Sequence, residues 1–385
     1  MRILVIDNVN YTDYPTGGIM SFYRSLLPAF GNDLELVGIS TDSNTPIGKW
    51  TKKELFNINF NYFSLAHITP TSKRPFIPER ISNCFHLFKY INKILKGHSF
   101  DVILTQTPET VYLIPKQYLA KTCFIVPGIE NPLSISRYPW ARKLTWFYDK
   151  FFYMPKTSKV RWLLAAADDN ARQRLADRSK GLIKVENIIS FPTRFDGDIY
   201  FPSRKEPLDN QVKTFVTVGR LGWFKGWKLM IDAFCLVHQK IEKSKLVFIG
   251  DGEDEQKIRN YIHQIKMDDA IELQGKREPK EIATCLNSSD AFIMGSFTEG
   301  WSTTLVEACA CGIPCVVTDF SSASTMVHNG KNGYIVHSRN EQEFAQSMLD
   351  VLKLNRQAVI DYDKQFEKYA LSHLKDELLY ILENK

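Results

Sequence analysis

The sequence predicts an α/β protein with two domains, each built on a mostly parallel sheet, and three features support this. The chain has 385 residues, which is more than a single hydrophobic core usually serves. Short apolar runs that end in glycine, asparagine or aspartate alternate with longer helical patterns, as in βα units. The segment 203–212 is polar, contains a proline and has no periodicity, so we interpret it as a linker between two such series.

The first βα series occupies the N-terminal half. Its predicted strands are the apolar runs 2–8, 34–40, 101–107, 122–128, 163–169 and 184–192. Gly17 and Gly18 follow the first strand and precede a helical pattern from Ile19 to Phe30. Backbone amides at this glycine pair could meet a phosphate or an acceptor, and a tight turn without function is the alternative.

The second series begins after the linker. Its predicted strands are 213–221, 245–253, 270–276, 289–296, 313–320 and 333–338, and the stretch 356–385 is expected to form helices with charged faces. The two halves together predict two Rossmann-like βαβ domains that face a central cleft. Such a cleft lies at the carboxyl ends of the strands, where open α/β sheets bind their ligands.

Composition narrows the class of protein. An apolar fraction of 44% and a charged fraction of 24% are typical of a soluble globular enzyme. The net charge of +6 suits an anionic substrate or an anionic membrane surface and is too small to indicate nucleic acid. The N-terminus resembles a strand rather than a signal peptide, and no apolar run has transmembrane length, so we expect a cytoplasmic protein.

The cysteines form no disulfide pattern. There are seven, an odd number, scattered along the chain, which favours a reducing compartment. Cys309, Cys311 and Cys315 are close together, but no histidine follows at ligand spacing. We interpret them as small buried hydrophobic residues and expect no metal site.

The segment 296–319 carries the strongest chemical signal. A buried strand ends in a polar loop with Glu299 and Gly300, and a helix is predicted to start near Thr303 and Thr304. The first turn of a helix offers unpaired N–H groups to phosphate, whereas carboxylates suit sugar or ribose hydroxyls. Glu299 precedes this helix and Glu307 lies inside it. The alternative is that Glu299 only caps the helix and Glu307 lies on a solvated face.

Two further loops follow predicted strands of the second series. Arg220 and Lys225 come after Gly219 at the end of a strand, where a cation pair can hold a diphosphate; two solvated loop cations are the alternative. In the sequence GDGEDE, Gly250 opens a loop where backbone could approach a nucleotide. The third glycine of the dinucleotide fingerprint is missing, so this loop is a weak signal by itself.

These motifs together resemble the retaining GT-B glycosyltransferases of the group 1 type, family four. The resemblance covers nearly the whole chain and is strongest from 213 to 336. It rests on Glu299 and Glu307 separated by seven residues, the following ACGIP, the sequences VGRL…KG, IGDGED and LQGK…PKEI, the early glycine pair, and SFPTRFDGDIYFP at 190–202.

The resemblance implies roles for individual residues of the second domain. Glu299 would contact the transferred sugar and Glu307 the ribose hydroxyls. Arg220 and Lys225 would hold the diphosphate with help from amides near Thr303 and Thr304. The remaining implied donor-site residues are Gly300, Gly219, Gly250, Lys276 and Arg277, the last two near the base.

The resemblance also implies a domain plan and a donor. Residues 1–202 would bind the acceptor, 213–360 would bind the nucleotide sugar, and 361–385 would form a C-terminal helix that returns to the first domain. The donor is a nucleoside diphosphate sugar, with UDP preferred over GDP, and transfer is metal-independent, without a cofactor.

One departure from the family concerns the first domain. Many relatives have a histidine after the strand that corresponds to 122–126, whereas this chain has Pro127-Gly128-Ile129-Glu130. We expect the role of that histidine to be vacant, or to be served by backbone near Gly128 or by Glu130.

The acceptor is expected to be a saccharide, lipid-linked as in many group 1 relatives that build bacterial surface polysaccharides. The segments 89–100 and 137–162 are basic and amphipathic or aromatic, so they suit an anionic membrane surface; packing within the protein is the alternative. Rival functions are a sugar-nucleotide epimerase or phosphorylase, a nicotinamide-dependent oxidoreductase and a non-catalytic saccharide-binding protein. The two glutamates favour transfer over the first and the incomplete glycine fingerprint disfavours the second. The cation pair disfavours the third.

Overall fold

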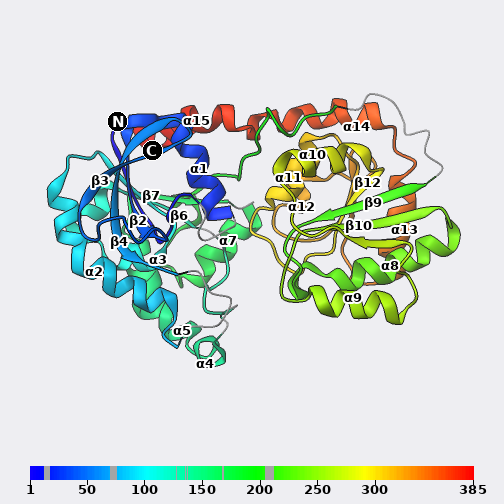
Figure 1. The fold of residues 1–385 in the computed structure, drawn as a ribbon, viewed down its shortest axis with the longest axis horizontal. Coiled ribbons are helices and arrows are strands. Elements are labelled where there is room, and N and C mark those ends of the chain that lie inside the picture. The colour runs from blue at the N-terminus through cyan, green and yellow to red at the C-terminus, as the bar shows by residue number, and fades with distance from the viewer. Residues whose placement is uncertain are drawn as a thin grey trace. The chain divides into compact units, whose positions relative to one another are not determined.

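The structure is a computed structural model of the chain and describes residues 1–12, 18–69, 76–126, 128–134, 136, 138–166, 169–203 and 212–385. The chain divides into two compact units. Unit 1 comprises Met1–Pro192 and Leu374–Lys385, and unit 2 comprises Thr193–His373. Figure 1 shows the chain passing from unit 1 to unit 2 and ending in α15.

Unit 1 contains an eight-stranded sheet in the order β3-β4-β2-β1-β5-β6-β7-β8. Its strands are β1 (Ile3–Ile6), β2 (Leu34–Ser40), β3 (Trp50–Leu55), β4 (Ile58–His67), β5 (Val102–Thr105), β6 (Thr122–Val126), β7 (Trp162–Ala165) and β8 (Ile188–Ser190). Its helices are α1 (Gly18–Phe30), α2 (Glu79–Gly97), α3 (Pro108–Leu113), α4 (Pro139–Arg142), α5 (Thr145–Tyr148), α6 (Met154–Thr157), α7 (Asp169–Arg178) and α15 (Leu374–Asn384).

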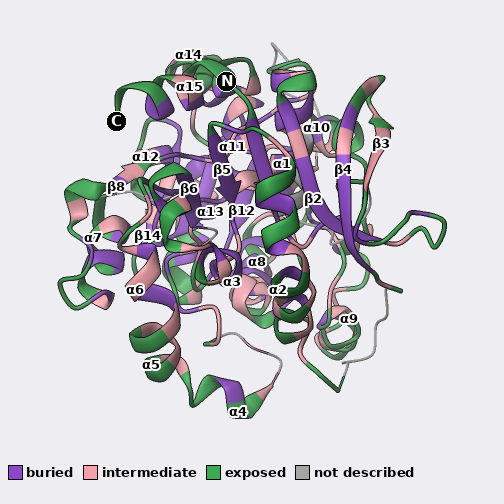
Figure 2. Cartoon of the chain, turned by 90° about the vertical axis from the view of Figure 1, so that its left-hand side faces the viewer, coloured by how far each residue is buried: buried purple, intermediate pink, exposed green. Residues whose placement is uncertain are grey.

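The predicted strands of unit 1 are all present, and a hairpin was missed. β3 and β4 pair antiparallel through a two-residue turn at Phe56 and Asn57, which both have positive φ angles. β3 was not predicted because it lies at the sheet edge and carries charged residues instead of an apolar run. The other strands of this sheet pair parallel, and the central ones are fully buried (Figure 2).

Unit 2 contains a six-stranded parallel sheet in the order β11-β10-β9-β12-β13-β14. Its strands are β9 (Lys213–Val218), β10 (Ser244–Ile249), β11 (Ile271–Leu273), β12 (Ala291–Met294), β13 (Cys315–Thr318) and β14 (Gly333–Val336). Its helices are α8 (Trp227–Lys240), α9 (Glu255–Gln264), α10 (Pro279–Ser288), α11 (Thr303–Ala310), α12 (Ala323–Met326), α13 (Glu341–Val351) and α14 (Arg356–Asp363). Every strand predicted for this half is found, in a shortened form.

The division between the units differs from the predicted domain boundary after residue 202. Residues 193–202 belong to unit 2 because their backbone is bound there: Phe195 N–H donates to Tyr369 O, and Asn287 donates to Phe201 O. Of the predicted linker 203–212, only residues 203 and 212 are described. In the predicted C-terminal region, α15 belongs to unit 1, where Lys375 Nζ lies 5.5 Å from the centre of the Phe30 ring.

Candidate functional site

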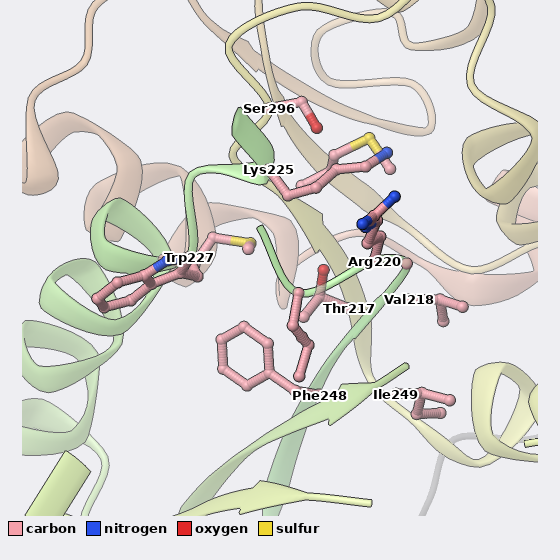
Figure 3. A pocket seen from close by; sticks show the side chains of 12 residues that line it. Thr217, Val218, Arg220, Lys225, Trp227, Phe248, Ile249 and Ser296 are labelled. Carbon is pink, nitrogen blue, oxygen red and sulfur yellow. The ribbon is translucent and has the colours of Figure 1, made fainter. Parts of the chain in front are cut away.

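The candidate site of unit 2 lies where its strand order changes direction. β10 and β11 continue the sheet on one side of β9, and β12, β13 and β14 continue it on the other. A pocket opens at the carboxyl ends of β9 and β12 and is lined by residues that include Gly219, Arg220, Lys225, Met294 and Ser296 (Figure 3). This is the switch point at which open α/β sheets bind ligands.

Two ion pairs dominate this pocket. Lys225 Nζ lies 2.5 Å from Glu299 Oε1, and the two side chains are 21% and 14% exposed. Arg220 Nε lies 2.8 Å from Glu253 Oε2, and these side chains are 53% and 47% exposed. Both predicted diphosphate cations are therefore paired with carboxylates, Lys225 in a mostly buried pair and Arg220 in a half-exposed one, and Figure 3 shows their nitrogen ends on the same side of the pocket.

The loops that carry Lys225 and Glu299 are packed backbone to backbone. Gly226 has a φ of +67°, and a Cβ atom there would lie 1.9 Å from Gly295 O. Phe297 N–H donates to Phe224 O at 2.8 Å. A glycine at 226 is thus required sterically, and the close approach brings Lys225 and Glu299 together.

Two side chains hold the Glu299 loop: Ser296 of the loop itself and Arg339, which follows β14. Ser296 Oγ donates to Glu299 Oε1 at 2.7 Å. Arg339 donates to Gly295 O at 2.9 Å and to Ser296 O at 2.6 Å. Since Glu299 accepts bonds from both Lys225 and Ser296, its carboxylate is held in one orientation.

The helix after this loop begins where the sequence predicts. Ser302 is the N-cap of α11, and its side chain accepts from Leu305 N–H. Glu299 therefore does not cap the helix, which answers the alternative interpretation of that residue. Thr303 and Thr304 form the first turn, where helix N–H groups have no acceptor within the helix. Gly300 lies in the loop between Glu299 and this turn.

Glu307 is partly buried rather than solvated. Burial raises the pKa of its carboxyl to about 8, and a hydrogen bond with the Tyr200 side chain lowers it in part. Tyr200 is itself buried, with 4% of its surface exposed. Glu307 is thus a partly desolvated carboxyl with one internal partner, and it is not part of the ion pairs at Arg220 and Lys225.

In the GDGEDE motif, a glycine is required at position 250 for a steric reason. Gly250 has a φ of +139°, and a Cβ atom there would lie 2.0 Å from Gly219 O. Its N–H donates to Gly275 O at 2.9 Å, which ties this loop to the one that carries Lys276 and Arg277. Both of those cations are exposed, and Arg277 Nη1 lies 3.5 Å from Glu281 Oε1.

The site residues predicted in unit 1 are less well defined. Gly17 lies outside the described residues, and Gly18 is the first residue of α1. Gly128 is partly buried with open space where a Cβ would stand, and Glu130 is exposed. Their predicted roles at an acceptor or phosphate remain predictions.

A second polar cluster lies at the switch point of unit 1, between β1 and β5. Asp7 is buried and accepts hydrogen bonds from Gln106 N–H at 2.7 Å, from Thr105 at 3.3 Å, and from Tyr23 and Thr107. Burial raises its pKa to about 6, although the four hydrogen bonds lower it. Asp7 stands at the end of the first predicted strand, and no motif in the sequence points to it as a site residue.

Three partners in unit 2 were also missed by the sequence analysis. Glu253 belongs to the predicted GDGEDE motif, but nothing in that motif indicates that it pairs with Arg220. Ser296 directly precedes the polar loop of Glu299. Tyr200 lies in the interdomain motif at 190–202, far in sequence from Glu307, and no local pattern points to that contact.

The cysteine cluster is buried. Cys309, Cys311 and Cys315 are 1% exposed or less, as expected for small hydrophobic residues. In the described ranges, no three His, Cys, Asp or Glu side chains are gathered so that they could hold a metal ion. None of the described helices combines the length and apolar character needed to cross a bilayer.

The chain is similar to known proteins in sequence and in structure. Residues 201–373 match the sequence model of the family described as "Glycosyl transferases group 1". An uncharacterized glycosyltransferase of Methanocaldococcus jannaschii is 23% identical to the chain over 316 residues, which are 74% of each protein.

Two of the similar solved structures illustrate the likeness over nearly the full length of the chain. The lipopolysaccharide outer core galactosyltransferase WaaB, in its apo form, has a TM-score of 0.69 and 16% identity and covers 99% of both chains. Anabaena HepE in complex with UDP and glucose has a TM-score of 0.70 and 14% identity and covers 100% of both chains. These likenesses confirm the predicted GT-B fold, and the sequence of unit 2 is similar to the group 1 glycosyl transferases.

Proposed function

We propose that this protein is a glycosyltransferase that moves a hexosyl or N-acetylhexosaminyl group from a UDP-sugar to a saccharide hydroxyl with retention of configuration. The observation that carries the proposal is the pocket at the switch point of unit 2, which Arg220 and Lys225 line, Arg220 paired with Glu253 and Lys225 with Glu299. The complex of UDP and glucose with Anabaena HepE supports UDP as the nucleotide.

The ion pairs suggest how the donor would be received. A diphosphate presents two negative charges to the pocket and would replace Glu253 at Arg220 and Glu299 at Lys225. Charge-assisted bonds from these cations are strongest where water is excluded, as at the partly buried Lys225. The released Glu299 carboxylate would then accept hydrogen bonds from sugar hydroxyls while Ser296 keeps it oriented.

The reaction that follows is a substitution at the anomeric carbon. The bond from that carbon to the diphosphate oxygen breaks, and a bond to the acceptor oxygen forms on the same face. The acceptor proton passes to the leaving phosphate. Arg220 and Lys225 would stabilise the charge that develops on the leaving diphosphate, which is the kind of term that dominates many active sites.

Glu307 is proposed to bind the ribose hydroxyls of the donor, and the exposed Lys276 and Arg277 are proposed to lie near the base. In this structure the Tyr200 hydroxyl donates a hydrogen bond to the Glu307 carboxyl. A ribose hydroxyl is the same kind of hydrogen-bond donor, so it would bind the Glu307 carboxyl in the way that the Tyr200 hydroxyl does here.

The acceptor is proposed to be a lipid-linked saccharide in the synthesis of a bacterial surface polysaccharide, at the inner face of the membrane. The likeness to a lipopolysaccharide outer core galactosyltransferase supports this class of product.

A thermal-shift panel of UDP-, GDP-, ADP- and dTDP-sugars tests the donor. A ligand that binds only the folded state raises its melting temperature, so we expect UDP-sugars to give the largest rise. Arg220→Ala and Lys225→Ala should reduce that rise. A rise with NAD and none with any nucleotide sugar would contradict the proposal.

A further inference from the structure

Two exposed aromatic rings lie beside the candidate site of unit 2. Among the residues that the structure describes, the exposed large hydrophobic side chains of this unit are Phe201, Trp223 and Phe297, which are 49%, 63% and 49% exposed. The rings of Trp223 and Phe297 are neighbours, with centres 5.6 Å apart and planes inclined at 54°. We call Trp223 and Phe297 the ring pair.

The ring pair is adjacent in sequence to residues that line the pocket. Trp223 is the first residue of the short helical turn η5 (Trp223–Lys225), which ends in Lys225, and Phe297 directly follows Ser296. Lys225 and Ser296 line the pocket, whereas the two rings do not. The ring pair therefore lies outside the pocket, on the two loops that carry the ion pair of Lys225 and Glu299.

Contacts within unit 2 hold the ring pair in place. The Arg339 guanidinium lies 3.7 Å from the centre of the Phe297 ring. The same group donates hydrogen bonds to Gly295 O and Ser296 O at 2.9 Å and 2.6 Å. Phe297 N–H donates to Phe224 O at 2.8 Å, which joins the two loops that carry the rings. Because these loops are already fixed, a ligand that binds the rings pays little conformational entropy.

The sheet topology separates the ring pair from the proposed ribose contact. The connection from β9 to β10 runs toward one edge of the sheet and that from β12 to β13 toward the other, so right-handed crossovers put α8 and α11 on opposite faces. Figure 1 shows α8 and α9 on one side of these strands and α10 and α11 on the other. The turn η5 leads into α8, and Arg339 precedes α13, which packs on α8, whereas Glu307 belongs to α11. The ring pair therefore lies toward the α8 face and Glu307 toward the α11 face.

A nucleobase can also stack on aromatic rings, but the proposed base contacts lie elsewhere. Lys276 and Arg277 follow β11, at one edge of the sheet. The ring pair follows β9 and β12 at the centre, and Arg339, which contacts Phe297, follows β14 at the opposite edge. The other parts of the donor already have the partners proposed above. Part of the acceptor is therefore the ligand that remains for these rings.

The size and chemistry of the ring pair suit a single sugar ring. A specific protein interface buries about 800 Å² of each partner, which is far more than two half-exposed rings offer. The faces of a pyranose ring carry C–H groups with a small positive charge, and the face of an aromatic ring is negative, so the two kinds of ring attract one another. Exposed Thr298, Asp319 and His337 follow β12, β13 and β14 at the same end of the sheet and offer polar groups to sugar hydroxyls.

We propose that the ring pair stacks against a pyranose ring of the saccharide acceptor. The proposal rests on the proposed glycosyl transfer and deepens it, since it adds a contact from unit 2 to those expected from residues 1–202. Glu299, the proposed contact of the transferred sugar, lies two residues after Phe297. An acceptor held on the rings would therefore be next to the sugar that it receives.

Oligosaccharide binding by the full chain tests the proposal. The probes are immobilised oligosaccharides of glucose, galactose, mannose and N-acetylglucosamine, presented with and without UDP. The unchanged chain should bind at least one of them, and Trp223→Ala and Phe297→Ala should each weaken that binding about tenfold or more. If the unchanged chain bound none of the probes, or if Trp223→Ala bound them as well as the unchanged chain, the proposal would be overturned.

Two further variants separate ring stacking from a general apolar contact. Trp223→Phe keeps a flat aromatic face and should retain most of the binding. Trp223→Leu keeps an apolar side chain without such a face and should lose binding as Trp223→Ala does. Equal binding by the leucine and phenylalanine variants would contradict stacking. The Trp223 side chain is exposed, so these variants should fold, which circular dichroism checks.

The matched control is Phe201→Ala, because this ring of unit 2 is 49% exposed, as Phe297 is, and lies outside the ring pair. It should bind the probes as the unchanged chain does, and a loss equal to that in Phe297→Ala would contradict the assignment. The rise in melting temperature with UDP should be unaltered in all these variants, since the rings do not line the pocket. A UDP shift that falls in the ring variants and not in the control would assign the rings to the donor and overturn the proposal.

The two measurements also separate this proposal from the proposed function. Oligosaccharide binding that depends on the rings, without any UDP shift, would keep the ring pair as a saccharide site and reject the proposed donor. A UDP shift together with oligosaccharide binding that is the same in all variants would support the donor and reject the ring pair.

Discussion

The two units of this protein place a carboxylate cluster at the same topological point and partner it in opposite ways. In unit 1, Asp7 follows β1 at the switch point and accepts hydrogen bonds from Tyr23, Thr105, Thr107 and the Gln106 amide. In unit 2, the cluster after β9, β10 and β12 consists of Glu253 and Glu299 paired with Arg220 and Lys225.

The difference lies in which partners a ligand could replace. The donors to Asp7 are neutral and enclose a carboxyl that is 1% exposed, so the cluster joins β1 to β5 as part of the core. The ion pairs of unit 2 border a pocket, and an anion of higher charge could take their cations. The first switch point holds the sheet together, and the second is able to exchange partners.

The largest expected effect is that of Lys225→Ala on transfer activity. The charge on the leaving diphosphate would lose a partly buried cation, so we expect a loss of about 2–4 kcal/mol, or roughly 30- to 1000-fold in kcat/KM. The measurement is product formation with the donor identified by thermal shift. Lys228→Ala is the matched control, because Lys228 is an exposed cation that pairs with Asp232 on α8. If the two variants had equal activity, Lys225 would not be a residue of the active site.

The next effect concerns Asp7 and the pH dependence of stability. Burial raises the pKa of Asp7 in the folded state from its ordinary value of 3.8 to about 6. Protons therefore favour the folded state, and this contribution is fully present below about pH 4 and is lost as pH rises through about 6. The difference corresponds to about 3 kcal/mol.

Asp7→Asn should remove this slope while costing stability at every pH, since the amide accepts fewer of the four hydrogen bonds. Denaturant unfolding between pH 4 and pH 7, with hydrogen exchange at β1 and β5 amides, measures the change. Glu307 and Asp363, whose pKa values are also raised, to about 8, are common to both proteins and cancel in the comparison. Parallel pH profiles for the two proteins would show that Asp7 does not titrate in this range.

A smaller effect is expected for Tyr200→Phe, which tests whether a ligand can replace the partner of Glu307, as proposed for Glu299, or whether that partner is part of the core, as at Asp7. Tyr200→Phe removes the hydroxyl partner of Glu307 and should cost about 1 kcal/mol of stability without nucleotide. If ribose hydroxyls replace that partner, UDP affinity should be unchanged or higher. Calorimetric titration with UDP measures this, and a clear fall in affinity would show that Tyr200 is needed to position Glu307.

The smallest effect is expected for Glu253→Gln. This variant frees Arg220 from an ion pair whose side chains are about half exposed, and exposed pairs contribute little. UDP should therefore bind slightly more tightly, by less than about 1 kcal/mol. Weaker binding in the same titration would indicate that Glu253 orients Arg220 instead of competing for it.

The fold could be predicted from the sequence where strands are short apolar runs between turn residues. The predicted strand 34–40 has the bounds of β2 in the structure. The hairpin β3–β4 could not be predicted in the same way, because an edge strand such as WTKKEL buries little and needs no apolar run. The boundary near residue 192 depends on long-range bonds to Tyr369 and Asn287, which no local pattern reveals.

The candidate site, too, could be predicted only in part. Arg220, Lys225 and Glu299 could be assigned to one site because each follows a strand of the same sheet, and parallel strands end at one edge. Their partners could not be assigned. Glu253 contacts Arg220, and Tyr200 contacts Glu307. These contacts depend on loops that pack together only in the folded chain, as where Gly250 lies against Gly219.

A crystal structure of the chain with bound UDP tests the central claim most directly. We expect diphosphate oxygens within about 3 Å of the Arg220 and Lys225 nitrogens, with the bonds from these cations to Glu253 and Glu299 broken. UDP bound away from this pocket, or bound there with both ion pairs intact, would contradict the account.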